Sequence, residues 1–134
     1  MGLVAIREGI QTRLKTIRGL KVYDRPPESL GELPAAFVLP ISGDYDTEFG
    51  DGIRYDFEIT LIVSRAADIA RAQSEVDPYI DRSGDKSVYA AIDGDVTLDG
   101  NADTCRVTRF KDYGGLTYAG TVYLGVKFEM EAWI

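Results

Sequence analysis

The side chains that could do chemistry in this chain are mainly carboxylates, because it contains 22 Asp and Glu residues, one cysteine and no histidine. Two acidic stretches, residues 93–95 (DGD) and 99–103 (DGNAD), have the composition of a calcium-binding loop. An EF-hand loop requires glycine at position 6 and glutamate at position 12. Counted from Asp93, these positions hold Leu98 and Thr104, so the pattern fails. We therefore expect two ordinary turns here and no metal site.

The other candidate catalytic groups lack the partners that catalysis needs. Cys105 begins a predicted strand with no base nearby, which is typical of a buried, inert thiol. Without histidine, the chain lacks the usual general base and the usual zinc ligand. Two carboxylate pairs, Asp56 with Glu58 and Glu129 with Glu131, fall on the polar faces of predicted strands, where solvated or interfacial charge is expected. We therefore expect a protein that is not an enzyme and needs no cofactor. The alternative, a small enzyme or ligand-binding domain, would place convergent carboxylates in a cleft.

Residues 42–52 (SGDYDTEFGDG) form a predicted acidic, glycine-bearing loop with two aromatic residues. Tyr45 and Phe49 would cost free energy in water, so we expect a neighbouring subunit to cover them. Asp46 and Asp51 belong to a set of four carboxylates that would seek basic side chains on that neighbour. The alternative is an exposed loop whose aromatic residues lie back on their own sheet.

Charge is unevenly distributed along the chain, which carries −7 overall. Residues 1–25 carry a net charge of +4 and the remaining residues −11. Arg7, Arg13 and Arg18 of the basic segment are therefore candidate partners for the acidic loop of a neighbouring copy, in a contact between unlike surfaces. So acidic a protein is poorly suited to gripping nucleic acid and better suited to a surface along which DNA passes. The alternative is a surface helix with solvated charges.

The hydrophobic pattern predicts one long strand and one amphipathic helix. From Ile53 the apolar residues occupy every second position, the period of a strand with one buried face. From Leu3 to Ile17 they recur at spacings of three and four, and Gly19 is the expected stop of that helix. We expect the strands to pack against this helix through two sets of apolar side chains: Ile53, Phe57, Leu61, Val126, Phe128 and Met130 of the sheet, and Ile6, Ile10, Leu14 and Ile17 of the helix.

The remaining elements complete a single α+β domain over residues 1–134, with an antiparallel or mixed β-sheet packed against the N-terminal helix and one or two short central helices. Pro78 should end or kink the first central helix, and Gly114-Gly115 should form the turn between the last two strands. The other predicted elements are a short strand at 21–24, an irregular connector at 26–34, a strand at 35–41, helices from 65 or 66 and at 85–92, and strands at 104–113 and 117–134.

Trp133 and Tyr123 lie on the face of the last predicted strand that is opposite to its aliphatic row. Aromatic side chains on a second sheet face indicate that this face is also covered, by a helix or by another chain. Trp133 is therefore a further candidate interface residue.

The order of these segments resembles that of the tail terminator (tail-completion) proteins of long-tailed bacteriophages. The resemblance covers residues 3–134, and its most specific parts are SVYAAID at 87–93 and YGGLTYAGTVYLGVKFE at 113–129. It implies a structural virion protein that forms a hexameric ring on the last ring of the tail tube, stops tube growth and joins the tail to the head connector.

The resemblance also implies the partners and the location. The partners would be further copies of the chain, the tail tube protein and the head-tail connector protein, with DNA only as a strand passing through the channel and with no membrane. The chain would reside in the tail or neck of the virion, and in the host cytoplasm during assembly. The alternatives within the same class are a head-tail connector or stopper and a tail-tube subunit.

Overall fold

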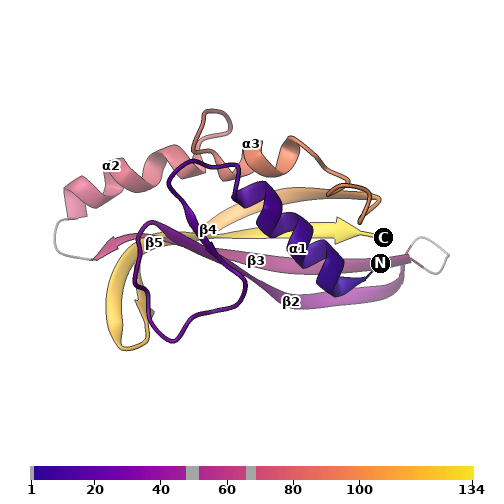
Figure 1. Cartoon of the computed structure of the whole chain (residues 1–134), viewed down its shortest axis with the longest axis horizontal. Helices are drawn as coiled ribbons and strands as arrows, with labels where there is room; N and C mark the ends of the chain where they lie inside the picture. Colours follow the sequence, from indigo (N-terminus) through magenta and orange to yellow (C-terminus); the bar gives the residue numbers. More distant parts are fainter. Residues whose placement is uncertain (1, 48–51, 66–68) are drawn as a thin grey trace.

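The computed structural model describes residues 2–47, 52–65 and 69–134, and in that part of the chain five strands form one sheet with three helices on one of its faces (Figure 1). The strand order is β1-β2-β3-β5-β4. Only β1 and β2 are parallel; the other neighbours are antiparallel. The expected α+β class is confirmed. The elements are α1 (Leu3–Leu14), β1 (Lys21–Tyr23), β2 (Ala35–Thr47), β3 (Gly52–Arg65), α2 (Ile69–Ile80), α3 (Val88–Asp93), β4 (Thr104–Tyr118) and β5 (Thr121–Trp133).

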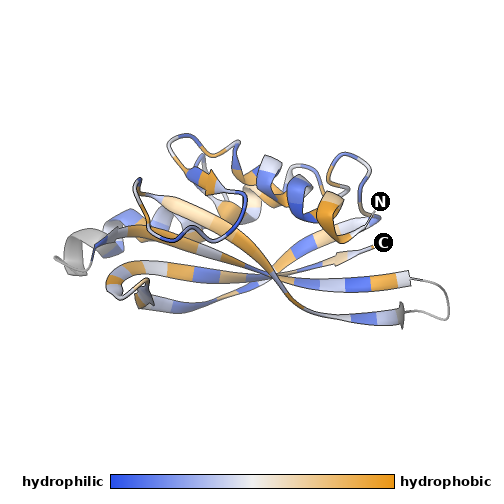
Figure 2. Cartoon of the chain, turned by 60° about the horizontal axis from the view of Figure 1, so that its bottom comes forward, coloured by the Kyte–Doolittle hydropathy of each residue, from blue (hydrophilic) through white to orange (hydrophobic). Residues whose placement is uncertain are grey.

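The larger core lies between the sheet and the helices, as the two periodicities predicted. Hydrophobic and hydrophilic residues alternate along the strands (Figure 2). Phe57 of β3 and Ile10 of α1 are both fully buried there. Ile53 alone among the predicted contacts is only half-buried, because it lies near the end of β3. Helix α1 also packs closely on the turn before β4, since a Cβ on Gly9 would approach the Leu98 Cβ to 2.8 Å.

A smaller core lies on the opposite face of the sheet, at the end where β1 is. Tyr123 is buried in it, and Leu30 of the connector between β1 and β2 covers it. The Phe37 and Tyr118 rings lie 5.4 Å apart, and the Tyr118 hydroxyl donates to the Pro27 carbonyl oxygen. A segment of the same chain, rather than another subunit, therefore covers Tyr123.

The predicted turn at Gly114-Gly115 is wrong, because β4 runs through both residues and the hairpin turns at Ala119-Gly120. Ala119 and Gly120 have φ of 51° and 81°, and a two-residue hairpin turn of this kind needs positive φ at both positions. Gly114 instead pairs with Gly125 beside an irregularity of the ladder. Its φ of 127° supplies the local bend.

Most of the predicted loop at 42–52 is strand. β2 continues to Thr47 and pairs with β3, with Tyr45 opposite Ile53. The strand was predicted to end near Pro40 because proline lacks an N–H group. β1 pairs only with residues 35–37 of β2, so the strand is a sheet edge at Pro40 and needs no donor on that side.

The helix boundaries also differ from the predicted ones. α1 ends at Leu14, where the Thr16 hydroxyl donates to the Arg13 carbonyl oxygen at 2.6 Å and the chain tightens into a turn. α2 continues through Pro78 to Ile80, and the buried side chain of Tyr79 holds this turn against the sheet. Packing therefore outweighs the single backbone hydrogen bond that proline removes. No helix in the described part of the chain is long and apolar enough to cross a membrane.

Candidate subunit interface

The most exposed large apolar side chain of the described residues lies on the β2–β3 hairpin. Tyr45 is 81% exposed, and in Figure 1 the two strands extend past the start of α1. Asp44 lies next to it on the other sheet face, where its carboxylate accepts from the Arg54 guanidinium at 2.6 Å. The hairpin therefore presents an aromatic residue on one face and a half-exposed acidic group on the other. It does not fold Tyr45 back onto its own sheet.

The sheet face opposite the helices carries a lattice of charged residues. Glu58 lies directly opposite Glu129, and Lys127 lies directly opposite Lys111, so both cross-strand pairs have like charges. Such pairs would be destabilising if they stood alone. The diagonal contacts remove the repulsion, because the Lys111 Nζ lies 3.1 Å from a Glu58 oxygen and 2.9 Å from a Glu129 oxygen. These hydrogen bonds, first the one with Glu129 and then the one with Glu58, raise the pKa of Lys111.

Trp133 lies on the charged face, as predicted, at the edge of this lattice. It pairs with Arg54 on one side and Thr104 on the other, and it is half-buried. The Arg106 guanidinium lies over its ring, 5.8 Å from the centroid. This contact leaves Arg106 largely exposed, at 69% of its side chain, so the pair is available to a partner.

The outer edge of β4 borders a shallow groove of about 480 Å³. Phe110 is 51% exposed beside it, and the groove continues to Tyr89 and Ile80 on the helix layer. Arg82 lies over the Tyr89 ring at 5.0 Å, and Arg109 also lines the groove. The lining of the groove therefore combines aromatic and basic side chains.

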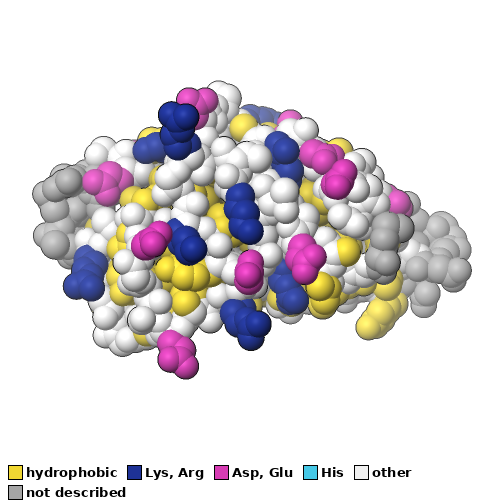
Figure 3. All heavy atoms as spheres, in the orientation of Figure 1, with side chains coloured by type: hydrophobic (Ala, Val, Ile, Leu, Met, Phe, Trp, Pro, Cys, Tyr) yellow, Lys and Arg dark blue, Asp and Glu magenta, His cyan; other side chains and the backbone are white. Residues whose placement is uncertain are grey.

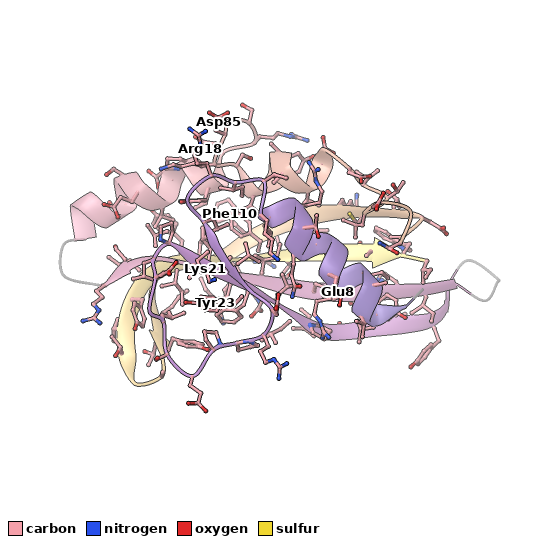
Figure 4. The ribbon with its side chains drawn as sticks, in the orientation of Figure 1. Glu8, Arg18, Lys21, Tyr23, Asp85 and Phe110 are labelled. Atoms are coloured by element: carbon pink, nitrogen blue, oxygen red, sulfur yellow. The ribbon has the colours of Figure 1, made fainter. Side chains whose placement is uncertain are left out.

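The three arginines predicted to meet the acidic hairpin have different surroundings. Arg13 is tied to its own chain, because its Nε donates to the Ala91 carbonyl oxygen at 2.8 Å and so joins α1 to α3. Arg7 lines a polar hollow beside Gln11, whose side-chain amide donates to the Asp24 carbonyl oxygen. Arg18 is exposed beyond the end of α1 (Figure 4). The structure does not bring these arginines together with Tyr45.

Part of the predicted interface falls outside the described residues. Phe49 and Asp51 belong to that part, and for Asp46 only the backbone is described, in β2. The interface predicted at 42–52 is therefore represented here by Asp44 and Tyr45.

Sequence reasoning missed the β4 edge. The stretch TCRVTRFKD carries Arg106, Arg109 and Lys111 around two apolar residues, and these three basic side chains share one face. The signal was the alternation of basic and apolar residues. It was hidden because a bulge between Val107 and Arg109 shifts the period by one residue.

The candidate catalytic and metal-binding groups have the surroundings of structural residues. Cys105 is buried, and burial raises the pKa of its thiol to about 11, so the reactive thiolate is scarce near neutral pH. The Asp95 carboxylate accepts from the backbone N–H of Asp99, which lowers the pKa of Asp95 and forms the predicted turn. In the described part of the chain, no group of three or more potential ligands could hold a metal ion.

Comparison with known proteins adds no assignment. No protein-family model matches this chain, and no curated protein sequence matches it either.

Proposed function

We propose that this chain is a structural subunit of a bacteriophage tail, a tail terminator that forms a hexameric ring on the last ring of the tail tube. The observation that carries an assembly role is the β2–β3 hairpin, which holds Tyr45 81% exposed. An aromatic side chain on an extended hairpin gains burial only from a partner, and exposed aromatic residues are enriched at protein interfaces. The order of sequence segments that resembles tail terminators supplies the specific role.

The charge pattern of the sheet face supports a role as a surface that other molecules pass or touch. Its carboxylates are engaged by basic side chains, as Glu58 is by Lys111 and Lys127. On the opposite side of the molecule, too, Lys and Arg alternate with Asp and Glu without a broad area of one sign (Figure 3). A surface of mixed and paired charges holds phosphate weakly, because tight binding needs clustered Lys and Arg. This character suits a channel through which DNA moves.

In this proposal the ring has two protein partners besides its own copies. One surface meets the tail tube protein and ends its polymerisation, and another meets the head-tail connector protein. The chain is then part of the tail or neck of the virion and assembles in the host cytoplasm, and it performs no catalysis.

The test is the behaviour of the purified chain alone and with polymerising tail tube protein from the same phage. Negatively stained particles of the wild-type chain should be rings with a central hole, and added chain should shorten the tubes. Tyr45→Ser should leave the melting temperature nearly unchanged and should yield tubes of uncontrolled length. The matched control is Val4→Ser on α1, since Val4 is also well exposed, at 57%. A strictly monomeric chain that leaves tube length unaffected would reject the proposal.

A further inference from the structure

The sheet has two free edges, which are chemically different. β4 has no strand beyond it among the described residues, and β2 is paired by β1 only at residues 35–37. Of the six large hydrophobic side chains that are exposed in the described residues, four lie on these two edge strands: Ile41 and Tyr45 on β2, and Phe110 and Tyr113 on β4. Unpaired edges that carry apolar side chains are templates for pairing with another chain.

We propose that the free edge of β4 pairs with the free edge of β2 in a second copy of this chain, so that the sheet continues across the subunit boundary. This inference deepens the proposed ring and rests on it for its biological role. The contact is heterologous, since each copy offers one edge and receives the other. Repeated around an axis, such a contact closes into a ring when the rotation between neighbouring copies divides a full turn.

Strand direction favours this pairing. β2 is antiparallel to β3, β3 to β5 and β5 to β4, so β4 runs opposite to β2. A neighbouring copy related by rotation about an axis along the strands therefore presents its β2 antiparallel to β4. Its helices then lie on the same side of the continued sheet, so no face is inverted.

Residues that pair across neighbouring strands form rows that run across the sheet, and these rows show which side chains would meet. One row across the sheet holds Ser42, Asp56, Glu131 and Arg106. Continued into the next copy, this row places Ser42 of the second copy beside Arg106 and Asp44 of the second copy on the same face as a diagonal neighbour. Diagonal neighbours lie about 7–8 Å apart, within reach of arginine. The side chains of Arg106 and Asp44 are 69% and 59% exposed, and their charges are opposite.

The helix-side face matches in the same register. Pro40 and Val107 share one row, so Pro40 of the second copy would lie beside Val107 and Ile41 would follow it. Both Pro40 and Ile41 are exposed in the isolated chain. Val107 and Phe110, which line the groove, give them apolar side chains to cover. A basic side chain therefore meets an acidic one on the charged face, and apolar side chains meet on the helix-side face.

Irregularities limit the pairing to a short segment. β2 has register shifts on both sides of Ser42–Tyr45, and β4 has one after Val107. The regular segments are thus 42–45 and 104–107, which are the ones that the continued rows bring together. Register shifts elsewhere along both strands disfavour pairing in other registers.

The test uses two full-length variants, each with one edge disabled. Arg106→Glu with Phe110→Ser alters the β4 edge, and Asp44→Asn with Ile41→Ser alters the β2 edge, so the two altered edges are not charge-complementary to each other. All four side chains are exposed, by 49–69%, so both variants should fold with melting temperatures near that of the wild type. A third variant, Val4→Ser in α1 with Arg18→Glu just after it, makes the same kinds of change at exposed positions away from both edges and is called the α1 variant.

Sedimentation and native mass spectrometry should show the wild type and the α1 variant as the same oligomer. Each edge variant alone should self-associate more than about tenfold more weakly, because the contact is lost at every boundary. Mixed in equal amounts, the two edge variants should form one-to-one dimers and nothing larger, since only one intact edge of each remains. Asp44→Asn and Phe110→Ser as single changes should weaken assembly in the same direction, without reversing any charge.

Three results would overturn the inference. Edge variants that assemble like the wild type, or a mixture that stays monomeric, show that these edges do not recognise each other. If the α1 variant fails to assemble while the edge variants assemble normally, the contact between copies lies at α1 or just after it. The proposed function can fail separately from the edge contact. If the wild type forms an oligomer and the mixture forms the predicted dimer, the edge contact is retained. If that oligomer has no effect on tube length, the tail terminator role is rejected.

Discussion

The two faces of the sheet are stabilised by different interactions, although both are built from the same strands. On the helix side, a continuous apolar core joins all three helices to β2, β3, β4 and β5. On the other side, a small apolar cluster around Phe37 and Tyr123 lies under the connector, and the rest of the face is a lattice of paired charges. The helix side therefore determines the stability of the subunit. The charged side and the edges beside it are free to serve contacts.

The largest loss of stability is expected for Phe57→Ala. Phe57 is fully buried between the sheet and the helices, and truncation of a buried phenylalanine costs about 3–5 kcal/mol. Urea unfolding followed by circular dichroism should show that loss. An unchanged unfolding midpoint would mean that the helix layer is not what stabilises the subunit.

The matched change on the other face is Phe37→Ala. Phe37 is 4% exposed but belongs to the smaller cluster, whose cover is an irregular connector that can move inward. The same unfolding measurement should give a loss near the lower end of the range, about 3 kcal/mol, because a cavity that collapses costs less. A loss larger than that of Phe57→Ala would reverse the ranking of the two faces.

The smallest expected effect is that of Glu58→Gln in the charged lattice. Glu58 contacts Lys111 and Lys127, and partly exposed ion pairs of this kind contribute about 1 kcal/mol or less. The loss should shrink further when salt is added, because exposed charges are screened. Glu131→Gln is the control, since the nearest Arg106 nitrogen is 3.8 Å away and that pair is looser.

The contact between Glu58 and Lys111 can also be tested by measuring thermal stability at alkaline pH. The carboxylates raise the pKa of Lys111, so the stability that they contribute is fully present below the ordinary lysine pKa of about 10.4. It is lost as the pH rises through the higher pKa of the folded state. The melting temperature of the wild type should therefore fall more steeply across this range than that of Glu58→Gln. Parallel curves would show that Glu58 does not act on Lys111.

Much of the fold was readable in the sequence because its signals are local. The period of two from Ile53 identified the buried face of β3, and the three-and-four spacing identified the buried stripe of α1. The turn at Asp99-Gly100 and the inert character expected of Cys105 also followed from nearest neighbours. Tyr45 stood out because an aromatic residue among carboxylates has no local reason to be there.

Tertiary structure alone decided the features that depend on which segments become neighbours. Alternation shows which face a residue takes but not which strand lies beside it, so the order β3-β5-β4 and the free edge of β4 could not be read from the chain. The bulge after Val107 put Arg109 and Lys111 on the same face as Arg106, against the simple period. Pro78 stayed helical because burial of Tyr79 outweighs one lost hydrogen bond. Residue types fix how each segment can fold, whereas the energy of contacts between distant segments selects the edges that remain open.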